Sequence, residues 1–116
     1  MEQNAILTSL VLELRRGTIV LCVLSQLQQP MYGYHLIGVL GEKGIPIEAN
    51  TLYPLLRRLE GQGLLESHWE TSGAKPRKYY GITPGGQQVY QALRAHWLQT
   101  VDSMNTLLGG NEHDSK

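Results

Sequence analysis

The chain has 116 residues, which is the size of one compact domain and too few for two independent hydrophobic cores. Its ten Lys and Arg residues are matched by ten Asp and Glu residues, so the net charge is zero, and attraction of the whole chain to phosphate is excluded as a strong driving force. No stretch approaches the roughly 20 consecutive apolar residues of a membrane-spanning helix, and no basic cluster precedes the first apolar run as in a secretory signal, so we expect a soluble, cytoplasmic protein.

The amino-terminal third has the spacing of helices. Apolar residues recur every three or four positions from Ile6 to Leu27, and Gly17 is expected to bend or divide this helix. Pro30 ends it, because proline cannot donate to the helical ladder. A second, short helix is predicted over Tyr32 to Lys43, with Gly44 as its stop.

A third helix is predicted to begin near Asn50 or Thr51, since either side chain can cap its amino terminus. Pro54 would then lie within about the first turn, where a missing amide hydrogen does little harm. One side of this helix is apolar, with Leu52, Leu55, Leu56 and Leu59. The other side is polar and free to contact a partner, with Asn50, Tyr53, Arg57 and Arg58.

Alternation replaces helical spacing after Gly63. Two alternating runs, 65–70 and 77–82, flank a connection rich in turn residues, which predicts a β-hairpin. Its tip is basic, with Lys75, Arg77 and Lys78 and no acid between Thr71 and Tyr80. Tyr80 shares a strand face with Ile82 and is expected to pack as core.

Thr83 and Pro84 provide a cap and a first residue for a last helix. Its apolar stripe continues over several turns through Tyr90, Leu93, Trp97, Val101, Met104, Leu107 and Leu108. This stripe is too apolar for a lone surface helix, so we expect it to pair with a second copy of the chain, covered in part by the partner's amino-terminal helix. The polar tail, 109–116, is expected to be disordered.

Three helices followed by a hairpin are the order of a winged helix-turn-helix module, so the predicted fold is mainly α with a small β-hairpin. In that fold the third helix enters the major groove and the hairpin, or wing, contacts the DNA backbone. Arg57 suits guanine or phosphate, and Asn50 suits adenine. Each residue also has a simpler interpretation: Arg57 can pair with Glu60 on a solvated face, and wing cations can protect an exposed strand edge. Only the ordered combination is informative.

Three segments carry a more specific resemblance: MYGYHLIGVL (31–40), ANTLYPLLRRLEGQGLL (49–65) and GAKPRKYYGITPGG (73–86). Together they resemble the signature of PadR-type transcriptional regulators, in that family's order and spacing, from about Leu14 to Leu108. The resemblance implies a DNA-binding region (1–83), a dimerisation helix (84–108) and repression of a gene. It also implies DNA contacts by Tyr32, Asn50, Thr51, Tyr53 and Arg57 on the helix-turn-helix and by Lys75, Arg77 and Lys78 on the wing.

A homodimer of this kind is expected to read a pseudo-palindromic operator, with half-sites about one DNA turn, roughly 34 Å, apart. Trp97 lies where some small PadR-like regulators stack planar ligands between two symmetry-related indoles, which implies a small aromatic or lipophilic effector. The alternative is that Trp97 only packs at the dimer interface with Tyr90, Leu93, Val101 and Met104, since aromatic residues are enriched at interfaces.

The sequence also bears on two other classes of function. The zero net charge favours a winged-helix module that binds a protein surface instead of DNA. An enzyme is not expected, because the chain lacks a phosphate-binding glycine loop, a supported acid pair and a nucleophile arrangement. The single Cys22 and four scattered histidines offer neither an intrachain disulfide nor metal-ligand spacing, so no metal or cofactor is expected.

Overall fold

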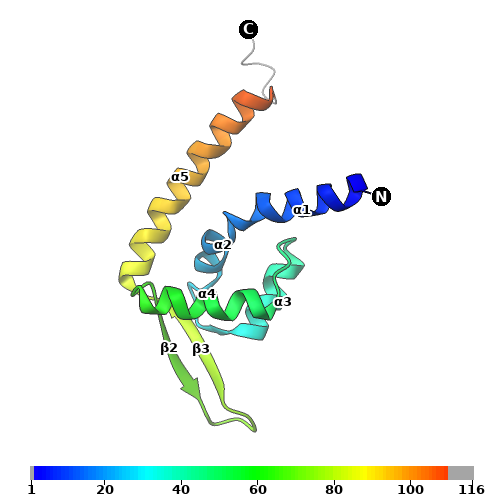
Figure 1. Ribbon diagram of the computed structural model, residues 1–116. Coiled ribbons are helices and arrows are strands. Elements are labelled where there is room, and N and C mark those ends of the chain that lie inside the picture. Colours follow the sequence, from blue (N-terminus) through cyan, green and yellow to red (C-terminus); the bar gives the residue numbers. More distant parts are fainter. Residues whose placement is uncertain (1, 110–116) are drawn as a thin grey trace.

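The computed structural model describes residues 2–109 and consists of five helices and three strands. A winged-helix body carries two long helices that extend from it (Figure 1). In chain order the elements are α1 (Glu2–Arg16), α2 (Ile19–Gln26), β1 (Met31–Tyr32), α3 (Gly33–Glu42), α4 (Ala49–Gly61), β2 (Leu65–Glu70), β3 (Arg77–Ile82) and α5 (Pro84–Leu108). The predicted fold class, mainly α with a hairpin wing, is confirmed.

The hydrophobic core lies between α2, α3, α4 and the sheet. The stripe predicted for α4 is confirmed, because Leu52, Leu56 and Leu59 are fully buried and Leu55 is half-buried against them. The other buried side chains are Val23, Leu24, Leu27, Leu36, Leu40, Ile47, Leu65 and Tyr80. This one core holds the helix-turn-helix and the wing as a single body.

The amino-terminal helix is divided, as Gly17 predicted. A turn at Gly17 and Thr18 separates α1 from α2, and the Thr18 amide and hydroxyl both donate to the Arg15 carbonyl, at 2.9 and 2.8 Å. α2 contributes to the core, whereas α1 has no buried residue and projects away from the body (Figure 1). The large apolar side chains of α1 therefore lack a partner within the described chain.

The predicted start of α4 was wrong. Glu48 is the amino-terminal cap, and its carbonyl accepts from the amides of Thr51 and Leu52 at 3.0 and 2.9 Å, so Asn50 lies inside the first turn. Pro54 is consequently the sixth helical residue, beyond the first turn, and cannot donate to the carbonyl four residues earlier. The physical reason is tertiary: Ile47 is anchored in the core, and the helix begins two residues after that anchor.

The wing is part of a three-stranded antiparallel sheet with the order β1-β3-β2, not an isolated hairpin. β1 has only two residues, Met31 and Tyr32, which pair with Tyr80 and Tyr79 of β3. Sequence analysis missed this strand. Tyr80 is 3% exposed, which confirms it as a core residue.

The last helix begins as predicted. Pro84 is its first residue, and the Thr83 hydroxyl accepts from the Gly86 amide at 2.9 Å while donating to the Gly63 carbonyl at 2.7 Å. Tyr90 and Leu93 pack against the core, and the rest of α5 runs away from the body (Figure 1). The tail expected to be disordered, apart from Gly109, lies outside the described residues.

The two protruding helices make the chain much less compact than a globular domain of its length. The radius of gyration is 17.2 Å, where about 13 Å is typical. Within residues 2–109 no helix has the length and apolar character to cross a bilayer, and no three His, Cys, Asp or Glu side chains gather as metal ligands.

Candidate nucleic-acid interface

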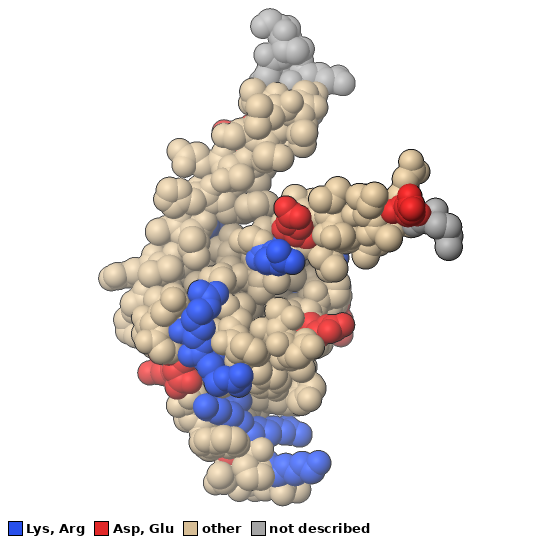
Figure 2. Space-filling model, viewed as in Figure 1, with Lys and Arg blue, Asp and Glu red and all other residues tan. Residues whose placement is uncertain are grey.

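The outer side of α4 presents polar side chains beside the wing. Asn50, Thr51, Arg57 and Arg58 are exposed, because the leucine stripe turns the opposite side of the helix into the core. Figure 2 shows Lys and Arg side chains gathered in a band over α4 and the β2–β3 hairpin. Five of the chain's ten Lys and Arg residues belong to α4 and the hairpin segment, although the whole chain is neutral.

Glu60, the acid proposed as an alternative partner of Arg57, accepts a hydrogen bond from a different residue. The Ser67 hydroxyl of β2 donates to Glu60 Oε2 at 2.6 Å, in a partly buried position. This bond joins the end of α4 to the wing. It also directs one carboxylate of α4 toward the sheet.

Tyr53 connects the two helices of the helix-turn-helix. Its phenol ring lies directly against Gly33, the first residue of α3, where even one added carbon would overlap the ring. Burial, followed by the neighbouring phenols Tyr34 and Tyr80, raises the pKa of Tyr53 above 10.0, so the hydroxyl keeps its proton. The ring is half-buried, and Tyr53 supports the geometry of the motif in addition to any DNA contact.

Tyr34 is an exposed aromatic residue that the sequence interpretation did not select. It lies at the start of α3, is 68% exposed, and meets Tyr53 edge-on with ring centroids 6.0 Å apart. The only signal for it was its place in the segment 31–40. Its position on the same motif adds a phenol beside the polar side of α4.

Tyr32 is half-buried beneath a wing cation. The Arg77 guanidinium carbon lies 4.5 Å from the centre of the Tyr32 ring, within the range of a cation–π interaction. Tyr79 packs edge-on against the same ring at 5.5 Å, and His35 lies at 5.8 Å. Tyr79 and His35 pack against the Tyr32 ring and fix its position. The Tyr32 ring in turn supports the Arg77 side chain.

The three basic residues of the wing are not equivalent. Strand alternation places Arg77 on the face of Tyr79 and Lys78 on the face of Tyr80, where the Lys78 Nζ lies 5.4 Å from the centre of the Tyr80 ring. Lys78 is half-buried, while Arg77 and Lys75 are exposed. The wing thus has two exposed cations, of which Arg77 lies against the Tyr32 ring, and a third that is partly covered.

The carboxylate nearest the wing tip is held by the turn itself. Glu70 Oε1 accepts from the Ser72 amide at 3.0 Å and from its hydroxyl at 2.8 Å, and these bonds lower the pKa of Glu70 below 4.5. Glu70 also pairs in register with Arg77 across the hairpin. The Glu70 carboxylate therefore stabilises the turn, and the hydrogen bonds from Ser72 stabilise its negative charge.

One further aromatic pair was not foreseen. His68 stacks on Tyr79 with centroids 5.7 Å apart and rings inclined by 13°, because the two residues are directly opposite each other on β2 and β3. The two alternating runs were recognised in the sequence, but the register that brings these rings together was not. The pair extends the row of rings that begins at Tyr32.

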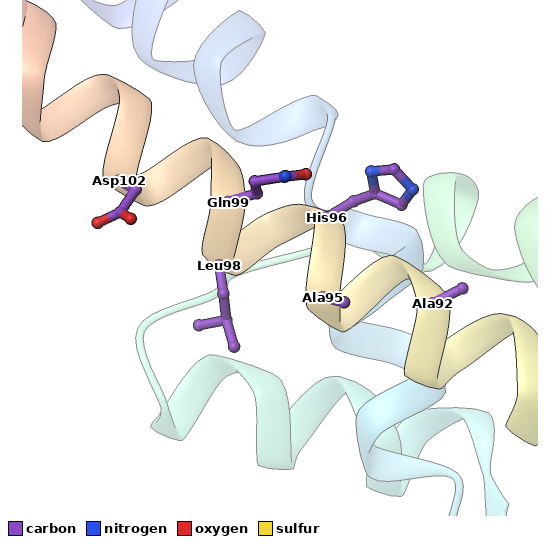
Figure 3. Close-up of a pocket in the computed structure, with 6 residues that line it drawn as sticks. All are labelled: Ala92, Ala95, His96, Leu98, Gln99 and Asp102. Carbon is purple, nitrogen blue, oxygen red and sulfur yellow. The ribbon is translucent and has the colours of Figure 1, made fainter.

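The residues expected at an effector or dimer interface differ in burial along α5. Tyr90 and Leu93 are half-buried against the chain's own core, Val101 is half-buried, and Trp97 and Met104 are 42% and 40% exposed. A depression of about 530 Å³ lies along this helix and is lined by Ala92, Ala95, His96, Leu98, Gln99 and Asp102. In Figure 3 His96 and Gln99 point to one side of α5 while Leu98 and Asp102 point to the other, so these side chains do not converge on a ligand.

Comparison with known proteins gives consistent matches. Residues 20–92 match the transcriptional regulator PadR-like family. The transcriptional regulator Rv3488 of Mycobacterium tuberculosis is 32% identical over 83 residues, which cover 72% of this chain and 75% of that protein. The crystal structure of a PadR family transcriptional regulator from Eggerthella lenta is 55% identical, covers 96% of this chain and 99% of its own, and superposes with a TM-score of 0.89. A PadR-like regulator from Bacillus cereus is 28% identical over 85% of this chain and 99% of its own, with a TM-score of 0.77.

Proposed function

This chain belongs to the PadR-like family of transcriptional regulators, and from that premise we propose that it is a cytoplasmic repressor that binds a pseudo-palindromic operator as a homodimer. The observation that carries the proposal is that one chain has a band of cations over α4 and the hairpin and also two helices, α1 and α5, with many exposed apolar side chains. The basic face supplies the affinity for phosphate, and the apolar helices supply a reason to dimerise. Such a protein binds without catalysing a reaction.

In the proposed complex α4 lies in the major groove. Asn50 and Arg57 are the side chains that can reach base edges, since both are exposed and both have donors suited to purines. Thr51 and Tyr53 offer hydroxyls to phosphate oxygens, and Tyr32 acts through Arg77. The remaining wing contacts to phosphate come from Lys75 and Lys78.

Dimerisation is assigned to α1 and α5, with 1–83 as the DNA-binding region and 84–108 as the dimerisation helix. The argument rests on exposed apolar area, because isolated proteins rarely leave a continuous apolar surface in water. The exposed apolar side chains of these two helices are Ile6, Leu7, Leu10, Leu12, Leu14, Val89, Trp97, Leu98, Met104, Leu107 and Leu108. Sedimentation velocity tests this assignment: a species of twice 13.0 kDa is expected, and a monomer at micromolar concentration would contradict it.

An aromatic or lipophilic effector at Trp97 is proposed as a second step. Its support is an indole that is still 42% exposed in one chain and lies on the helix assigned to dimerisation. Since the side chains of the neighbouring depression do not converge, a ligand would need walls from both protomers. Titration of planar compounds against Trp97 fluorescence, with Trp97→Phe as the control, tests it. Absence of quenching specific to Trp97 would leave that residue as interface packing.

The DNA proposal is tested by fluorescence anisotropy with duplex DNA from upstream of the protein's own gene and with a scrambled duplex of equal length. Binding should favour the first duplex, and the logarithm of the affinity should fall linearly with the logarithm of salt concentration, by about 0.9 for each phosphate contact. No binding of either duplex in dilute buffer would favour the alternative, a winged-helix module that binds a protein.

A charge reversal in the wing sharpens this test. Arg77→Glu should weaken binding to both duplexes, because a phosphate contact carries no sequence information. Lys43→Glu is the matched control, since Lys43 is also exposed but follows α3 and lies outside α4, the wing and the helices assigned to dimerisation. Equal affinities of the two variants would remove the wing from the mechanism.

A further inference from the structure

A groove of about 350 Å³ lies between α2 and α4, away from Trp97. Its floor is aliphatic, with Ile19, Val20, Pro54 and Leu55, and its polar groups are Arg16, Arg58 and Thr51. Within the described chain no acidic side chain and no aromatic ring lines this groove. It therefore combines an apolar trough with two positive charges.

This combination selects a class of ligand. A volume of this size lies at the lower end of the range for small-molecule sites. Guanidinium groups offer paired donors that match a carboxylate, and aliphatic walls favour an acyl chain over a flat ring, which would find no ring here to stack on. We propose that the groove binds a medium-chain aliphatic carboxylate, with its head group at Arg16 and Arg58 and its chain against Ile19 and Leu55.

The groove lies at the joint between the dimerisation arm and the recognition helix. Arg16 is the last residue of α1, and Gly17 follows it in the turn that separates α1 from α2. Within the described residues, and apart from its chain neighbours, nothing lies within 4 Å of the position that a Cβ atom of Gly17 would take, so no side chain packs against the turn at this point. Arg58, by contrast, belongs to α4. A carboxylate that binds both guanidinium groups fixes the direction of α1 relative to α4.

A regulatory consequence follows, and it rests on the proposed function. In a dimer joined through α1 and α5, fixing the direction of α1 changes the distance between the two recognition helices. The ligand shifts operator affinity only by its preference for one of these arrangements. Thr51, which lines the groove, is also one of the side chains assigned to phosphate, so the ligand and the DNA would both contact α4.

The binding step is tested without DNA by NMR, with octanoate as the probe and octanol as the neutral control of equal chain length. Octanoate should shift the backbone amides of Val20 and Leu55, with the Trp97 indole signal unchanged, and octanol should bind at least tenfold more weakly. Shifts confined to Trp97, or equal binding of the two compounds, would overturn the site.

Substitutions of single arginines test which side chains bind the carboxylate group. Arg16→Gln and Arg58→Gln should each weaken octanoate binding roughly tenfold, because each removes a charge-assisted hydrogen bond. Arg15→Gln is the matched control, since Arg15 is the exposed neighbour of Arg16 and does not line the groove. Equal loss in Arg15→Gln would reduce the effect to general charge and refute the site.

Operator binding is then measured with and without octanoate. A change in affinity that disappears in Arg16→Gln supports the regulatory step, since Arg16 lines the groove but is not among the residues assigned to DNA. If octanoate binds but operator affinity stays constant, the site stands and its regulatory role is rejected. If no operator is bound at all, the proposed function fails while the NMR result is unaffected.

Discussion

Replacement of Gly86 should destabilise the protein, because this residue is where α5 passes closest to the body. A Cβ atom at Gly86 would overlap the Leu64 carbonyl oxygen and approach Ile82 Cγ1 to 2.8 Å. That carbonyl cannot simply retreat, since it accepts from the Thr83 amide at 3.1 Å. The adjacent Gly85 is the matched control: its nearest such neighbour is the Gly63 carbonyl oxygen at 3.8 Å, an ordinary contact.

The magnitude follows from two opposing terms. Alanine stabilises a helix relative to glycine by at most about 1 kcal/mol at either position. Overpacking against a fixed neighbour costs about 1–3 kcal/mol or more, and this term applies only at Gly86. We therefore expect Gly85→Ala to be neutral or slightly stabilising and Gly86→Ala to be destabilised by about 1–2 kcal/mol. For a chain of this length that difference corresponds to a fall in Tm of about 4–10 °C.

Thermal denaturation followed by circular dichroism measures the effect, with both variants at the same protein concentration because the proposed dimerisation would make Tm depend on concentration. A second readout is operator affinity at a temperature where both variants are folded. Since the added methyl group pushes α5 away from Leu64 and Ile82, Gly86→Ala should also weaken operator binding. Equal Tm values for the two variants would show that α5 does not rest against the Leu64 carbonyl as described.

Three further predictions concern the wing. Ser67→Ala should lower the free energy of unfolding by about 1 kcal/mol in urea denaturation, because it removes the hydrogen bond to Glu60, and an unchanged midpoint would contradict that bond. Ser72→Ala should return the pKa of Glu70 toward its ordinary value of 4.5, as measured by NMR titration of the carboxyl carbon. Since the folded-state pKa of Glu70 is lowered, its contribution to stability is complete above pH 4.5 and is lost as the pH falls through the lowered value, so Ser72→Ala should flatten stability in acid. Lys75→Ala should reduce the salt dependence of operator affinity by about 0.9 in log–log slope, and an unchanged slope would exclude a phosphate contact there.

Local patterns were enough to predict most of the helices. The leucine spacing of α4 and the Thr83 and Pro84 pair before α5 are signals carried within a few residues, and the structure confirms both. β1 could not be predicted in this way, because a strand of two residues has no period. It exists only because β3 lies beside it, after nearly fifty intervening residues.

The prediction of the residue that caps α4 failed for a related reason. Asn50 is a good cap by its own chemistry, yet Glu48 takes that position because Ile47 is fixed in the core. Local propensity was overridden by tertiary packing. The same limit applies to the candidate DNA surface: alternation separates Arg77 from Lys78, but only the pairing of β1 with β3 places Arg77 over Tyr32.

That contact has a consequence for how such a protein can be regulated. Tyr32 immediately precedes α3 and holds Arg77 of the wing, while Tyr53 of α4 packs on Gly33. The wing and both helices of the motif are therefore braced against one another through two aromatic rings. At Gly17, by contrast, the part of the chain that the structure describes leaves open the space that a Cβ atom would occupy. In the proposed dimer, a ligand that changes the distance between the two recognition helices should consequently act where α1 and α5 leave the body, and not between α4 and the wing.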